Sequence, residues 1–239
     1  GRDPFDERSG ARDVLGYMPQ QYSLYGDLSV AENLAFFREM YGLERAMFVA
    51  RRDRLMHLTR LAAFRDRRAS ALSGGMYKKL ALACALLHDP KVLLLDEPTT
   101  GVDPVSRREL WDLLHEFLAE GVAIAIATPY MDEAARCHRA GMLYGGALLA
   151  EGAPAELVAA FPHPVYTLHG DRDALEAAIA SSADVLAFTP AGARLRVVVR
   201  RGREQGVLAG LAAAGARAEP AAATFEDLFL ATVRERSAA

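Results

Sequence analysis

Two adjacent carboxylates, Asp96 and Glu97, follow the apolar run Val92–Leu95. Such a run is typical of a strand in a parallel sheet that is buried on both faces, and open α/β sheets bind ligands beyond the carboxyl ends of their strands. One carboxylate there can hold a hydrated magnesium ion, and the next can orient or deprotonate an attacking water, as phosphoryl transfer to water requires. The pair could equally cap the next turn, so alone it leaves both interpretations open.

A second candidate site is the tripeptide Ser73-Gly74-Gly75, which opens a helical run. Its free backbone N–H groups, its hydroxyl and the positive end of the helix dipole suit an anionic phosphate. A serine with two glycines is also a common helix start without any ligand. The order of the segments favours the phosphate interpretation, because one helix and the strand with its carboxylates follow the tripeptide, and then come Gly101, Val102 and Asp103.

The elements that must position these residues alternate between strands and helices. Apolar runs predict strands at 14–18, 92–96 and 122–128. Capping residues and apolar spacing predict helices that follow Ser29 and Asp103, and further helices over 44–63, 76–88 and 132–138. This alternation predicts an α/β layer fold with a largely parallel sheet.

The C-terminal part has a different pattern, which begins after Pro162 and Pro164. We expect a hairpin over 142–151 and a helix over 155–160 before this boundary. Beyond it we predict a strand over 165–169, a helix over 171–181, two strands over 184–189 and 194–200, and a helix over 203–214. A strand over 217–220 and a final helix from Thr224 follow. The first six elements have the β-α-β-β-α-β order of a small α+β ferredoxin-like module. We therefore predict one domain over 1–161, with a helical subdomain at about 24–89, and an accessory module over 162–239.

Composition restricts the classes of function. The 239 residues are 51% hydrophobic and 25% charged, as in globular proteins, and the net charge of −3 argues against a nucleic-acid partner. Cys84 and Cys137 lie far apart, which fits a reducing compartment and excludes a disulfide framework. The longest apolar runs fall well short of the ~18 residues that span a bilayer, so we expect a soluble chain.

Over roughly residues 12–152 the sequence resembles the nucleotide-binding subunits of ATP-binding cassette (ABC) transporters. Four motifs match in the family's order. The resemblance implies a P-loop NTPase fold, ATP and Mg²⁺ as cofactors, and hydrolysis of ATP to ADP and phosphate. It implies that Gln20 is the Q-loop glutamine that contacts magnesium and water, and that Ser73, Gly74 and Gly75 are signature residues that contact ATP held by the opposing subunit. It also implies that Asp96 is the Walker B aspartate, Glu97 the catalytic glutamate and Asp103 the D-loop aspartate.

Residues 22–34 and the run Tyr130–Ala134 are similar to multidrug and antibiotic exporters of the ABC-2 type. In that branch a separate ATPase chain carries a small C-terminal extension, which residues 163–239 resemble. The resemblance implies a second ABC ATPase subunit as partner and an integral membrane permease that exports hydrophobic small molecules. Residues 24–72 would dock the permease, which would hold this cytoplasmic subunit at the inner face of the membrane.

Two departures from the family pattern matter. No glycine precedes a lysine anywhere, so the phosphate-binding pattern G-x-x-x-x-G-K-[ST], or Walker A, has no match. Only 19 residues precede Gln20, so we expect a chain truncated before the Q-loop that is inactive alone. Pro129 stands where the family places a histidine that contacts the γ-phosphate. Two interpretations of Pro129 are open: a site that hydrolyses slowly or relies on Glu97 alone, and a degenerate regulatory half of an ATPase pair. A soluble ABC ATPase without a transporter is a further alternative.

Overall fold

The structure, a computed structural model, describes residues 10–21 and 23–237. Residues 1–9 of the predicted first domain and Tyr22 of the exporter-like segment lie outside this range. The chain forms two compact units, Gly1–Pro129 and Tyr130–Ala239, which we describe separately. The domain boundary expected from the sequence, between 161 and 162, stays a prediction.

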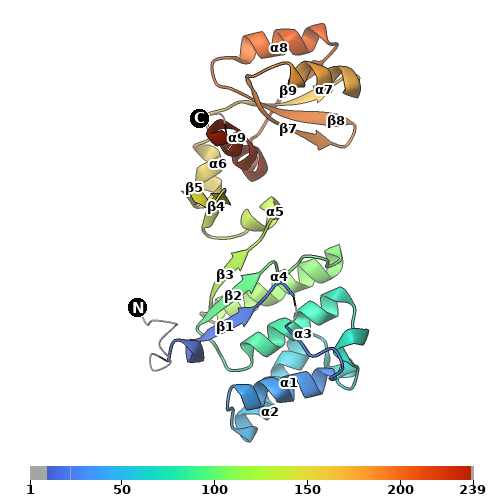
Figure 1. Ribbon diagram of the computed structural model, residues 1–239, viewed down its shortest axis with the longest axis vertical. Helices are drawn as coiled ribbons and strands as arrows, with labels where there is room; N and C mark the ends of the chain where they lie inside the picture. The colour runs from blue at the N-terminus through green and yellow to red at the C-terminus, as the bar shows by residue number, and fades with distance from the viewer. Residues whose placement is uncertain (1–9, 22, 238–239) are drawn as a thin grey trace. The chain divides into compact units, whose positions relative to one another are not determined.

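The first unit is built on a three-stranded parallel sheet (Figure 1). Its strands are β1 (Leu15–Met18), β2 (Val92–Asp96) and β3 (Ala123–Ala127), in the order β1-β2-β3. Met18 pairs with Leu95, and Asp96 pairs with Ala127. Because the strands are parallel and in this register, the residues that follow all three emerge at one edge of the sheet.

One face of this sheet is buried and the other is not, which corrects the expectation of a strand covered on both sides. Leu93 and Leu95 are buried with residues of α3 (Gly74–Leu86) and α4 (Pro104–Ala119). On the opposite face Leu94 is partly exposed and Ala125 is exposed. The helices α3 and α4 therefore supply the core on the face of Leu93 and Leu95.

The helical part of this unit contains α1 (Val30–Met40) and α2 (Arg45–Leu58). The predicted capping box at the start of α1 is confirmed, because Ser29 and Glu32 exchange side-chain to backbone hydrogen bonds of 2.7 and 3.2 Å. Short 3₁₀ turns occupy Arg12–Val14, Ala62–Phe64 and Ala69–Ala71.

The helix predicted over 44–63 is too long at its C-terminal end, because α2 ends at Leu58. Arg60 has a φ of +59°, and the amide of Leu61 donates to the carbonyl of Met56 at 2.9 Å. The amide of Arg60 also donates to the carbonyl of His57. These two bonds form a Schellman motif, which ends α2 at Leu58 although no glycine marks the stop.

The second unit begins with α5 (Met131–Ala134), the hairpin of β4 (Ala140–Tyr144) and β5 (Ala147–Gly152), and α6 (Pro154–Ala159). The helix predicted over 132–138 is too long, since the amides of Arg136 and Cys137 donate to carbonyls only three residues back. The predicted hairpin is confirmed, and its turn glycines both have positive φ.

The remaining elements of this unit have the predicted order. They are β6 (Val165–His169), α7 (Arg172–Ala180), β7 (Val185–Ala191), β8 (Arg194–Val199), α8 (Glu204–Ala213), β9 (Arg217–Ala221) and α9 (Phe225–Ser237). The sheet is antiparallel, in the order β7-β8-β6-β9, with the β-α-β-β-α-β connection of ferredoxin-like modules. Within the part of the chain described here, every helix is too short or too polar to cross a membrane.

Candidate functional site

Gln20 and Glu97 meet at the carboxyl edge of the parallel sheet. Gln20 follows β1, Glu97 follows β2, and the Gln20 Nε2 donates to the Glu97 Oε2 at 2.7 Å. The hydroxyl of Thr100 donates to the same carboxylate oxygen at 2.9 Å. Two neutral donors therefore fix the orientation of the Glu97 side chain, and the amide oxygen of Gln20 is the end left for a cation or a water.

The backbone of Glu97 has an unusual conformation. Its φ is +44°, in the left-handed region that non-glycine residues rarely adopt. The surrounding structure holds it there, because the amide of Glu97 donates to the carbonyl of Ala127 at 2.8 Å and its carbonyl accepts from the amide of Thr100 at 3.3 Å. Such strained residues concentrate at functional sites, where neighbouring contacts maintain them.

Lys78 links the loop that contains Gln20 to the loop that contains Glu97. Its ammonium donates to the carbonyl of Gln20 at 2.9 Å and to the carbonyl of Glu97 at 3.4 Å. The side chain comes from α3 and the residue is only 9% exposed. Burial lowers the pKa of Lys78, while the negative charges of Glu97 and Asp96 act in the opposite direction.

Asp96 ends β2 and is half-buried beside this cluster. Its carboxylate and the amide oxygen of Gln20 are oxygen donors of the kind that Mg²⁺ prefers, so the residues present fit the ion that the sequence resemblance implies. Among the described residues no group of three or more His, Cys, Asp or Glu side chains could hold a metal. Mg²⁺ in nucleotide sites commonly takes one or two carboxylates from the protein and its other ligands from phosphate and water.

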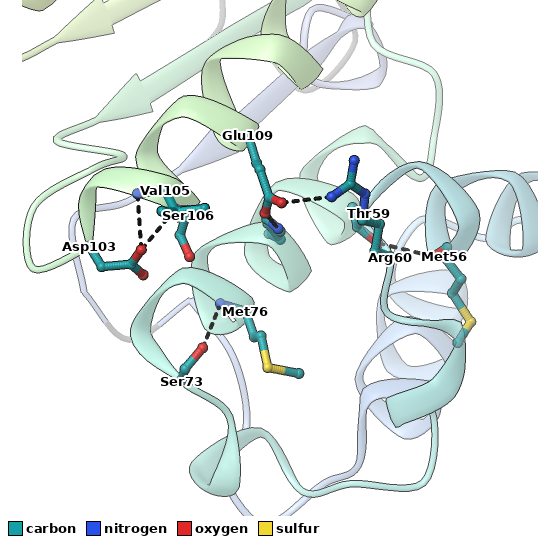
Figure 2. A network of polar contacts seen from close by, with 10 residues as sticks. Met56, Thr59, Arg60, Ser73, Met76, Asp103, Val105, Ser106 and Glu109 are labelled. Carbon is teal, nitrogen blue, oxygen red and sulfur yellow. Dashed lines mark hydrogen bonds and ion pairs between the residues drawn. The ribbon is translucent and has the colours of Figure 1, made fainter.

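The signature residues form a second cluster at the start of α3, beside the start of α4 (Figure 2). Ser73 caps α3, and its hydroxyl accepts from the amide of Met76 at 3.3 Å. Asp103 caps α4, and its carboxylate accepts from the amides of Val105 and Ser106 at 3.1 and 3.0 Å. Hydrogen bonds from Ser106, through its side chain and its backbone, lower the pKa of Asp103.

Gly75 allows the two helix starts to approach each other. A Cβ at this position would lie 2.3 Å from the Cβ and Oγ of Ser106, and one at Gly74 would lie 3.0 Å from the carbonyl oxygen of Gly101. Both glycines are therefore explained by packing, whether or not their amides also contact a phosphate. Ser73 and Gly74 are exposed.

Three residues that the sequence reasoning did not single out support these clusters. Lys78 and Thr100 hold the loops of Gln20 and Glu97. Glu109 of α4 accepts from Lys79. Glu109 also accepts from Arg60 at 2.7 Å (Figure 2). The available signal was the pair of lysines at 78 and 79 within an apolar helix, because lysine is rarely buried without a partner.

The predicted site residues therefore fall into two groups. Gln20, Asp96 and Glu97 lie at the edge of the sheet, and Pro129 follows β3 at the same edge and is exposed. The signature residues and Asp103 lie at the starts of α3 and α4, the two helices that pack with the sheet. The helix α3 carries Ser73 at its cap and Lys78 within it, so it connects both groups.

Comparison with known proteins gives consistent matches to ATP-binding proteins of transporters. The family model described as "ABC transporter" matches residues 1–100. The probable multidrug ABC transporter ATP-binding protein YbhF of Escherichia coli K12 is 46% identical over 157 residues, which are 66% of this chain and 27% of that protein. The Nod factor export ATP-binding protein I of Paraburkholderia xenovorans LB400 is 44% identical over 150 residues, which are 62% of this chain and 49% of that protein. The chain thus spans half or less of the length of these relatives.

Solved structures agree with this match. The ATP-binding subunit of an ABC transporter has a TM-score of 0.55 at 29% identity and covers 61% of each chain. The protein cbiO1 from Clostridium perfringens, described as part of the ABC transporter complex cbiONQ, has a TM-score of 0.58 at 29% identity and covers 65% of this chain and 64% of its own. With the motif order and the sheet-edge geometry above, these matches show that about two thirds of this chain is similar to the ATP-binding subunits of ABC transporters.

Proposed function

We propose that this chain is part of an ATP-hydrolysing subunit that energises an ABC exporter of hydrophobic small molecules. The observation that carries the proposal is the 2.7 Å hydrogen bond between Gln20 and Glu97 at the edge of the sheet, beside Asp96. The names of the relatives support an exporter, since one belongs to multidrug transport and the other to Nod factor export.

In this proposal Glu97 orients the attacking water and accepts its proton, which the fixed side chain allows without rearrangement. Gln20 presents its amide oxygen to the same water and to the cation, and Asp96 supplies a carboxylate ligand. When bound, Mg²⁺ neutralises charge on the phosphate oxygens of ATP. The N–H groups at the start of α3 and the hydroxyl of Ser73 would face the γ-phosphate of ATP held by a second ABC ATPase subunit.

Other parts of the proposal concern the chain's surroundings. The helical subdomain, which contains α1 and α2, would dock an integral membrane permease and so hold the subunit at the cytoplasmic face of the membrane. The module that contains β6 to α9 would stabilise or regulate the pair of ATPase subunits. Because no segment of the chain fits G-x-x-x-x-G-K-[ST], we expect it to bind ATP only weakly by itself.

The second candidate is a regulatory half of an asymmetric ATPase pair, and Pro129 is the observation that favours it. Proline has no backbone N–H and no side-chain donor, so it cannot contact a γ-phosphate as a histidine would. A soluble ABC ATPase without a transporter stays as a third alternative.

The test is magnesium-dependent phosphate release from ATP by the protein expressed from its complete reading frame, with and without its membrane partner. Hydrolysis that the permease stimulates is the expected result. Hydrolysis without any permease dependence would favour the soluble ATPase, and no hydrolysis in either condition would favour the regulatory half.

A further inference from the structure

The ammonium of Lys78 has an environment that is unusual for a buried charge. It donates to two backbone carbonyls, those of Gln20 and Glu97, rather than to carboxylates. Burying a cation in this way costs free energy unless its donors are satisfied. The burial of Lys78 is therefore better explained by its hydrogen bonds to these two carbonyls than by an ion pair.

The two carbonyls belong to loops that follow different strands. Gln20 comes after β1 and Glu97 after β2, so one side chain from α3 links both loops to the same helix. The bond to Glu97 is made at the residue with a φ of +44°. A donor to that carbonyl helps to keep the peptide in a conformation that is otherwise unfavourable.

The neighbouring Lys79 shows that burial in α3 does not by itself give a lysine this role. Consecutive helical residues point about 100° apart, and Lys79 bonds Glu109 of α4 instead. The side chains of Lys78 and Lys79 are thus both buried, on one helix, and serve different partners.

We propose that Lys78 is a positioning residue, whose ammonium holds the loops of Gln20 and Glu97 so that their side chains meet. Its relevance to catalysis rests on the proposed ATPase function, whereas the positioning itself is a property of the chain without nucleotide. The side chain of Lys78 acts through Gln20 and Glu97 and needs no contact with ATP.

The experiment measures hydrogen exchange of the Gln20 side-chain amide by NMR in the nucleotide-free chain, with Gln20→Ala to identify the signals. The exposed Gln205 is the internal reference. In the wild type the Gln20 amide should exchange about tenfold more slowly than that of Gln205, since it donates to a carboxylate. Lys78→Met should abolish this roughly tenfold slowing of Gln20 exchange. Lys78→Arg, which keeps donors and charge, should retain part of it.

Lys79→Met is the matched control, because it removes a buried lysine of the same helix. It should lower stability and leave the Gln20 signals unchanged. A folded Lys78→Met protein with wild-type Gln20 exchange would overturn the proposal, and so would equal loss in Lys79→Met, which would indicate a general effect on α3.

If Lys78→Met does not fold, the wild type supplies the decisive measurement. The proposal requires a slowly exchanging Lys78 ammonium signal with a through-hydrogen-bond correlation to the carbonyl carbon of Gln20, and a freely exchanging ammonium would overturn it. None of these readouts uses ATP. An absence of ATP hydrolysis would therefore contradict the proposed function alone.

Discussion

The side chain of Gln20 donates a hydrogen bond to Glu97, although 77 residues separate the two in the sequence. Parallel pairing of β1 with β2 brings them together, because Met18 lies opposite Leu95 and both loops leave the sheet at one edge. The strand register, more than any local motif, therefore creates the candidate site.

Gly75→Ala tests the packing of α3 against α4. The added Cβ would lie 2.3 Å from the side chain of Ser106, so we expect the free energy of unfolding to fall by about 1–3 kcal/mol. Chemical denaturation of Gly75→Ala, of Ser106→Gly and of the double variant gives the coupling free energy between the two positions. The double variant should recover most of the loss caused by Gly75→Ala, and purely additive losses would contradict the clash.

Much of this fold follows from local sequence signals. Ser29, Ser73 and Asp103 were predicted as helix caps, and each accepts the expected backbone hydrogen bond. Turn glycines and the alternation of apolar runs similarly predict the hairpin of β4 and β5 and the order of elements in the second unit. These features depend on contacts within a few residues, which a single sequence records directly.

The features that could not be predicted depend on distant partners. The end of α2 rests on Arg60 in a left-handed conformation, where sequence rules expect glycine, and Arg60 also pairs with Glu109. The partial exposure of Leu94 reflects which face of the sheet the helices cover. Lys78 bonds to carbonyls that lie 58 and 19 residues away, and no local pattern identifies them.

Pro129→His tests whether the proline limits hydrolysis. An imidazole at the end of β3 would restore a donor toward the γ-phosphate, so phosphate release by the complete protein should rise at least about tenfold. Pro129→Ala is the control, because it removes the ring and restores the backbone N–H without adding a side-chain donor. An unchanged or lower rate in Pro129→His would show that the proline is not the limiting defect.

Asp227→Asn tests the ion pair that fixes α9 to the sheet of the second unit. Asp227 is 2% exposed, and its carboxylate accepts bonds of 2.7 to 3.0 Å from Arg196 and of 2.7 Å from Thr224. Burial would raise the pKa of Asp227, but these bonds and the charge of Arg196 outweigh it and lower the pKa. Removing the charge should cost about 3 kcal/mol of unfolding free energy.

The control for this prediction is Glu226→Gln, which removes an exposed carboxylate from the same turn of α9. Because the pKa of Asp227 is lower in the folded state, its contribution is present above the unfolded value near 3.8 and is lost as pH falls through the folded value. Equal effects of Asp227→Asn and Glu226→Gln on denaturation would show that the buried pair adds nothing.

His88 should make the stability of the first unit depend on pH. Burial lowers the pKa of His88 below its ordinary 6.5, and the hydrogen bond to the carbonyl of Leu15 only partly compensates. The unfolded chain then binds more protons, so stability should fall as pH drops below about 6.5, by at most about 1.4 kcal/mol per pH unit. His88→Gln should remove this part of the slope.

The exposed His57 serves as the reference for that measurement. Urea denaturation at several pH values between 5 and 8 gives the slopes, and His57→Gln controls for the removal of an exposed imidazole. If His88→Gln kept the full pH dependence, another group would be responsible and the half-buried imidazole of His88 would not explain it.

The most direct test of the proposed ATPase site is phosphate release by the complete protein with Mg²⁺ and ATP, in the wild type and in Glu97→Gln. Loss of a general base costs about 10²–10⁴-fold in rate, so we predict a fall of at least about 100-fold. Glu116→Gln, at an exposed position of α4, should keep the wild-type rate. A Glu97→Gln protein that hydrolyses ATP as fast as the wild type would contradict the assignment of this sheet edge as the catalytic site.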